Sequence, residues 1–153
     1  MTNASNSASN PVRAQWLAVL ARASREELEA FVAALGPFPD RELVRPAEAG
    51  LVMLRGRVGG TGDAFNLGEA SLVRCAVRLG CVLGVGYSLG RDKRKAELIA
   101  LLDALLQDES RAASLVRDVV QPLQQRQQAR RDAHSRCAAS SKVDFFTMAR
   151  GET

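Results

Sequence analysis

Glycine is distributed very unevenly along this chain, and that distribution limits the folds open to it. Ten of the twelve glycines fall between Gly50 and Gly90. Glycine weakens helix interiors and permits the positive φ angles of turns, so this region predicts strands joined by turns rather than long helices. The expected strands cover residues 43–45, 51–58, 65–79 and 82–89, with turns at 59–62 and 80–81.

Alternating side chains within these segments predict a sheet with two unlike faces. One face of 65–79 is expected to carry Phe65, Leu67, Ser71, Val73, Cys75, Val77 and Leu79. Arg74 and Arg78 lie on the other face of that segment. In the last segment, Leu83, Val85, Tyr87 and Leu89 alternate with small residues. The pattern is typical of an antiparallel meander with one face covered.

Helix signals flank this region on both sides. Asn10 and Pro11 start one helix, and Ser24 with Glu27 forms a capping box that starts a second, which ends at Gly36. After the strands, Asp92 can cap a helix whose apolar stripe consists of Leu98, Leu101, Leu102 and Leu105. A further helix is expected from 109 to about 136, with a kink at Pro122.

Together these elements predict an α+β fold: an N-terminal helical hairpin, an antiparallel β-meander, C-terminal helices and an extended apolar tail. The 153 residues, 46% of them hydrophobic, suit one domain, which we place at 11–153. Residues 1–10 are rich in Asn, Ser and Ala and predict a disordered lead-in rather than a secretory signal. Three cysteines without CxxC spacing indicate a reducing, cytoplasmic environment and a structural role for Cys75.

Two cationic segments are candidate binding sites for an anion or an acidic partner. Arg55 and Arg57 lie in a glycine-rich segment whose backbone amides could bind an oxyanion, although a hairpin turn explains most of that pattern. Arg91 and Lys93 lie where a helix begins, and the helix dipole there favours anions. A solvated first turn remains an alternative for the second segment.

The C-terminal segment at about 140–153 is the third candidate, because it is apolar and follows a basic helix. Its apolar residues are Val143, Phe145, Phe146 and Met148. Such a tail must either return to its own core or insert into a partner. We interpret it as a partner-docking tail.

The remaining polar residues suggest no catalytic or metal site. His134 is the only histidine, and no Cys, His or acidic cluster has metal-ligand spacing. Six arginines between Arg111 and Arg136 could meet nucleic acid, an acidic partner or solvent, but no aromatic is interleaved with them to stack on bases. No apolar run reaches the length of a membrane span. We therefore expect neither nucleic acid nor a membrane as partner.

Four blocks of the sequence resemble one known family. RGRVGGTG at 55–62 is followed by SLVRCAVRL at 71–79, GYSLGRDK at 86–93 and VDFFTMARG at 143–151. In this order the chain resembles the PhnG family, the G subunit of the bacterial carbon–phosphorus lyase core complex. The likeness covers about residues 12–153.

This resemblance implies a subunit in phosphonate catabolism. The family acts with the H, I and J subunits, and with associated K and L proteins, to displace adenine from ATP by methylphosphonate. The product is alpha-D-ribose 1-methylphosphonate 5-triphosphate. ATP would thus be a substrate of the complex, a transferase, while this chain would bind no cofactor, supply no catalytic residue and have no activity alone. The alternative is a stand-alone small phosphate- or nucleic-acid-binding protein.

Overall fold

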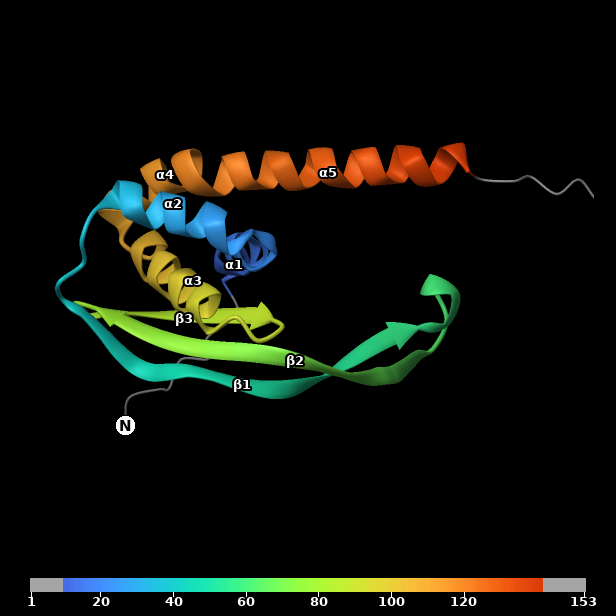
Figure 1. Cartoon of the computed structure of the whole chain (residues 1–153), viewed down its shortest axis with the longest axis horizontal. Coiled ribbons are helices and arrows are strands. Elements are labelled where there is room, and N and C mark those ends of the chain that lie inside the picture. Colours follow the sequence, from blue (N-terminus) through green and yellow to red (C-terminus); the bar gives the residue numbers. More distant parts are fainter. Residues whose placement is uncertain (1–9, 142–153) are drawn as a thin grey trace, which may run out of the picture.

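The computed structural model describes residues 10–141 and has the expected α+β architecture (Figure 1). Its elements are α1 (Pro11–Arg22), α2 (Arg25–Leu35), β1 (Arg41–Arg57), a 3-10 turn (Val58–Gly60), β2 (Ala64–Leu79), β3 (Val82–Leu89), α3 (Lys93–Leu106), α4 (Glu109–Leu115), a π-helical segment (Val116–Val120) and α5 (Gln121–Ser140). The helices lie over one face of the sheet, here called the covered face, and leave the open face bare. The lead-in through residue 9 and the tail from 142 lie outside the described residues.

The predicted helix starts are confirmed. The Asn10 side chain accepts from the backbone N–H groups of Val12 and Arg13 at the start of α1. Ser24 and Glu27 form the reciprocal capping box of α2. These contacts satisfy N–H groups that have no partner within the helix itself.

The three strands form an antiparallel sheet in the order β1-β2-β3. The prediction of two separate strands at 43–45 and 51–58 was wrong, because a single strand, β1, covers both. It runs without interruption from Arg41, opposite Leu79, to Arg57, opposite Ala64. Register irregularities lie between Leu43 and Arg45 and between Arg45 and Glu48. The second spans Pro46, which has no N–H to donate to the neighbouring strand. Strand β1 is therefore longer than the two strands that the sequence predicted.

A second irregularity divides the apolar face expected for β2. Leu54 lies opposite Gly68, but the next residue, Arg55, lies opposite Asn66, so Leu67 is an extra residue in β2. Phe65 consequently shares a face with Gly56, not with Val73. The single continuous face predicted for 65–79 was wrong at this end because a bulge interrupts the alternation.

Strand β3 turns its small residues toward the helices. Gly84, Gly86 and Ser88 are buried, whereas Tyr87 and the neighbouring leucines lie on the open face. A Cβ added at Gly86 would overlap the carbonyl oxygen of Ala96 on α3. The glycines thus let α3 approach the sheet closely, and the larger alternating residues are left exposed.

Helix α3 is the centre of the core. The predicted stripe is confirmed, since Leu98, Leu101, Leu102 and Leu105 are all buried. Trp16 and Leu20 of α1 and Leu28 of α2 belong to the same buried cluster. The core therefore lies between α3, the helical hairpin and the covered face.

The long C-terminal helix is interrupted, but just before the expected kink. A π-helical segment precedes α5, and the N–H of Gln121 donates to the carbonyl of Val116. Pro122 has no N–H to donate to residue 118, and its ring would crowd that carbonyl. The wider π turn accommodates both effects.

Strands β1 and β2 extend well beyond β3. Pairing between β2 and β3 ends at Leu72 opposite Leu89, so residues 50–71 form a two-stranded ribbon with a turn at its tip. We call these residues the arm. Figure 1 shows the arm and the second half of α5 projecting toward the same end of the molecule.

Candidate functional site

Of the candidate cations, Arg55 and Arg57 lie near the tip of the arm. The Arg57 guanidinium donates to the carbonyl of Gly62 at 3.2 Å, across a turn in which Gly59 and Gly60 have positive φ angles. Arg57 therefore holds the turn together. Within the described residues Arg55 has no ion-pair partner.

Arg91 and Lys93 lie at the start of α3. The two other cationic side chains there, those of Arg94 and Lys95, already have partners within the fold. Asp92 caps the helix through the N–H of Lys95, whose ammonium donates to the carbonyl of Ala21 at 2.9 Å. Burial lowers the pKa of Lys95. Arg94 pairs with acidic residues of α2 and α3. Arg91 and Lys93 form no ion pair in the part of the chain that the structure describes.

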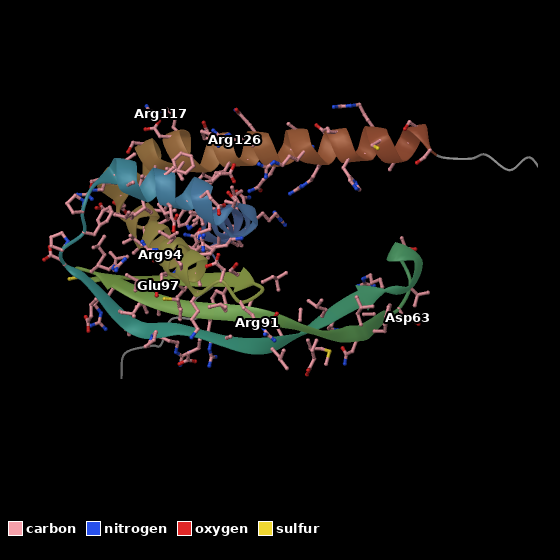
Figure 2. All side chains as sticks on the ribbon, in the orientation of Figure 1. Asp63, Arg91, Arg94, Glu97, Arg117 and Arg126 are labelled. Carbon is pink, nitrogen blue, oxygen red and sulfur yellow. The ribbon has the colours of Figure 1, made fainter. Side chains whose placement is uncertain are left out.

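The two cationic segments do not form one site. The N–H of Gly90 donates to the carbonyl of Ser71, which lies opposite Leu51. Arg55 follows Leu51 by four residues, about 13 Å along an extended strand. Figure 2 shows Arg91 at the base of the arm and Asp63 close to its tip. Arg91 and Lys93 therefore lie at the base of the arm, and Arg55 and Arg57 lie near its tip. The predicted tail residues Val143, Phe145, Phe146 and Met148 lie outside the described residues.

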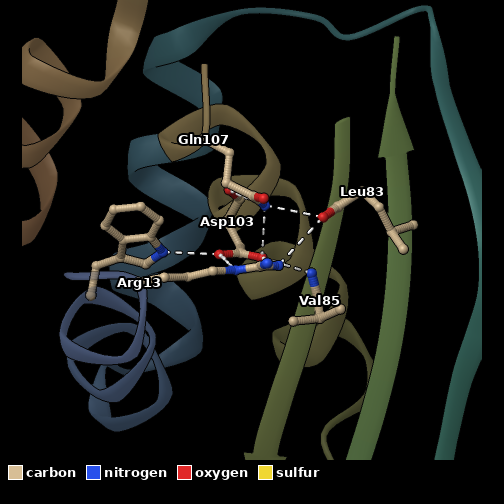
Figure 3. Close-up of polar contacts among 6 residues, drawn as sticks. Arg13, Leu83, Val85, Asp103 and Gln107 are labelled. Atoms are coloured by element: carbon tan, nitrogen blue, oxygen red, sulfur yellow. Dashed lines mark hydrogen bonds and ion pairs between the residues drawn. The ribbon is translucent and has the colours of Figure 1, made fainter. Parts of the chain in front are cut away.

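The least expected polar feature is a fully buried carboxylate, Asp103 of α3 (Figure 3). It accepts from the guanidinium of Arg13, with a shortest N···O distance of 2.6 Å, and from the indole N–H of Trp16 at 2.9 Å. It also accepts from the backbone N–H of Val85 and the amide of Gln107. With every oxygen occupied by donors, Asp103 joins α1, α3 and β3 and is unsuited to proton transfer.

A groove of about 370 Å³ lies between α1 and α5. Its polar lining consists of Gln15, Arg22, Gln121, Gln124, Gln127, Gln128 and Arg131. None of the described residues lining it carries a carboxylate, imidazole, thiol or hydroxyl. The groove therefore offers hydrogen bonds but no general acid, base or nucleophile.

The basic C-terminal segment is partly neutralised within the fold. Arg126 and Arg130 both approach Glu27 of α2, and Arg117 pairs with Asp118. His134 is exposed on α5. Over residues 10–141, no cluster of three or more His, Cys, Asp or Glu side chains could hold a metal ion. No described helix has the length and apolar character needed to cross a membrane.

Sequence reasoning missed the extent of exposed apolar surface on the arm. Leu51, Met53 and Leu54 are 69%, 47% and 37% exposed, and Phe65 and Leu67 are also exposed. The sequence does contain a signal for this exposed surface, a run of four consecutive apolar residues at 51–54. Such a run differs from the alternation of a strand with one wet face.

Comparison with known proteins matches the sequence of this chain to one family. The family model described as phosphonate metabolism protein PhnG matches residues 11–151. Alpha-D-ribose 1-methylphosphonate 5-triphosphate synthase subunit PhnG from Rhizobium meliloti (strain 1021) is 44% identical over 145 residues, spanning 92% of this chain and 90% of the relative. The chain belongs to the PhnG family of phosphonate metabolism proteins.

Proposed function

We propose that this chain is the G subunit of a cytoplasmic alpha-D-ribose 1-methylphosphonate 5-triphosphate synthase in the carbon–phosphorus lyase system. The similarity to the curated synthase subunit, which runs through nearly the whole chain, carries this proposal. In it, the complex displaces adenine from ATP with methylphosphonate. The chain works with the H, I and J subunits and the associated K and L proteins.

The subunit's role is to bind and position partners rather than to perform chemistry. Its buried carboxylate is fully used in packing, and the groove between α1 and α5 lacks acid–base groups among its described residues. The arm, by contrast, exposes apolar side chains that a self-sufficient monomer would have no use for. A supporting role in the complex accounts for both features.

The test is reconstitution. The chain co-expressed with the H, I and J subunits is expected to co-elute with them on size exclusion, and the complex with L is expected to release adenine from ATP plus methylphosphonate. Omitting this chain should abolish adenine release. Release by this chain alone would instead identify an independent enzyme, and failure to co-elute with folded partners would reject the subunit role.

A group of cationic residues is proposed to contact partners or substrate. Arg55, Arg91 and Lys93 bind acidic surfaces or a phosphate that a partner presents, while Arg57 supports the turn. The double substitution Arg91→Ala and Lys93→Ala is expected to weaken assembly or raise the KM for ATP. The same loss in Arg94→Ala, whose charge is already paired, would argue for a nonspecific charge effect.

The tail is proposed to dock on a partner through Phe145 and Phe146. The double alanine variant is expected to weaken assembly more than it lowers the melting temperature of the isolated chain. Equal losses in both measurements would place these side chains in the chain's own core.

A further inference from the structure

Both faces of the arm carry exposed apolar side chains. Leu51 and Met53 continue the covered face, because Ala49 on that side lies opposite Val73. Leu54 and Phe65 continue the open face. A strand that is apolar on both faces is typical of burial on both sides. Within the described residues, however, no third strand pairs with the arm, and these side chains remain exposed.

The two edge strands of the sheet, β1 and β3, also differ in how available their backbone is for pairing with another strand. On β3, the backbone N–H of Val85 donates to the side chain of Asp103, and Arg13 and Gln107 donate to the carbonyl of Leu83. These contacts block pairing with another strand at residues 83–85 of β3. The first half of β1 contains Pro46 and charged residues, which discourage edge pairing. The stretch at 49–54 contains neither and remains an open apolar edge, which is followed by Arg55 and Arg57 near the tip.

We propose that the arm inserts into a cleft of another synthase subunit, which covers both faces and adds a strand to the edge of β1 at 49–55. This inference rests on the proposed function. A two-stranded ribbon is marginal by itself in water, and a partner would supply the third strand and the missing cover.

The charges of the arm indicate the chemistry of that partner. On the outer strand of the arm, segment 49–57 contains two arginines and no acid, whereas the acids of the arm, Asp63 and Glu69, lie in the turn and on β2. Arg91 with Lys93 adds positive charge at the base. A second copy of this chain would bring the same cations to the contact. The partner cleft therefore has an apolar interior and carboxylates at the side that meets Arg55.

Matched variants test whether both faces are covered. Leu51→Ser with Met53→Ser alters one face, Leu54→Ser alters the other, and Val12→Ser changes a 54% exposed residue on α1 as a control. The full-length variants are compared by retention on the immobilised, tagged H, I and J subunits and by melting temperature alone. We expect each arm variant to cut retention about tenfold or more, with little change in melting temperature, while Val12→Ser binds normally.

Hydrogen exchange tests strand addition directly. Amides at 49–55 on the outer edge of β1 are expected to exchange rapidly in the free chain and slowly in the complex. No new protection there, or a loss of binding from one face only, would overturn the proposal. So would a wild-type dimer that the arm variants convert to monomer, because a second copy would then occupy the arm. If wild type and Val12→Ser also failed to bind, the proposed function itself would fall.

Discussion

The carboxylate of Asp103 on α3 accepts a hydrogen bond from the backbone N–H of Val85 on β3, at an N···O distance of 2.9 Å. A side chain of the helical layer thereby takes the place of a neighbouring strand. An unpaired edge is a template for association with other chains, so this contact also limits where the sheet can grow. It leaves β1, and the part of β2 in the arm that extends beyond β3, as the edges available for pairing.

We predict that Asp103→Ala destabilises the fold by about 3–5 kcal/mol, the range for breaking a buried ion pair. The substitution leaves the Arg13 guanidinium, the Trp16 indole N–H and the Val85 amide without their acceptor. Asp103→Asn should cost less, because its one carbonyl oxygen still accepts. Urea unfolding measures both. A loss below about 1 kcal/mol for Asp103→Ala would show that these donors find other partners.

The close approach of α3 to β3 makes a second prediction. Gly86→Ala is expected to destabilise the fold by about 3 kcal/mol or more, because the added methyl group overlaps the backbone of Ala96. Gly50→Ala is the matched control, since a Cβ there meets no atom within 4 Å. Its unfolding free energy should change by less than about 1 kcal/mol. Equal behaviour of the two variants would contradict the packing described here.

Local signals predicted the elements well because they depend on neighbouring residues. The caps at Asn10 and Ser24 and the stripe along α3 each follow from side chains within a few positions of one another. The α+β class followed from the order of these signals and from the concentration of glycines. Resemblance to the PhnG family supplied the function, which no local pattern contained.

What escaped prediction depends on contacts between distant residues. The sequence around Pro46 shows a break, and only pairing with β2 makes β1 continuous. The role of Gly86, part of the GYSLGRDK block, is visible only once α3 lies against β3. Most donors to Asp103, the single acidic residue within the apolar stretch 98–106 of α3, come from residues 18 to 90 positions away, so no local pattern indicates its role.

Glu27 predicts a pH-dependent contribution to stability. The backbone N–H of Ser24 donates to its carboxylate and, with Arg126 and Arg130, holds its pKa below the ordinary value of 4.5. Because the folded-state pKa is the lower one, the stabilisation is present above about pH 4.5 and is lost as the pH falls through the folded-state pKa. Glu27→Gln should lower the unfolding free energy by less than about 1 kcal/mol at pH 7.

Urea unfolding of wild type and Glu27→Gln at several pH values between 7 and 3 measures this effect. The difference between the two proteins is expected to shrink as the solution is acidified. A difference that stayed constant, or grew, at low pH would mean that the carboxylate is not held ionised by the cap and the two arginines.

The three cysteines are expected to differ in reactivity. Cys75 is 3% exposed and its thiol donates to the carbonyl of Arg45 at 3.4 Å, whereas Cys81 and Cys137 are exposed. Burial, with a smaller effect of Glu97, raises the pKa of the Cys75 thiol, which reduces the thiolate fraction that reacts. A thiol reagent such as DTNB should therefore modify two cysteines rapidly in the folded chain and the third only on unfolding in urea. The Cys75→Ala variant should keep both rapid reactions and lose the slow one. Three equally rapid reactions in the folded wild type would mean that the covered face opens far more readily than its packing indicates.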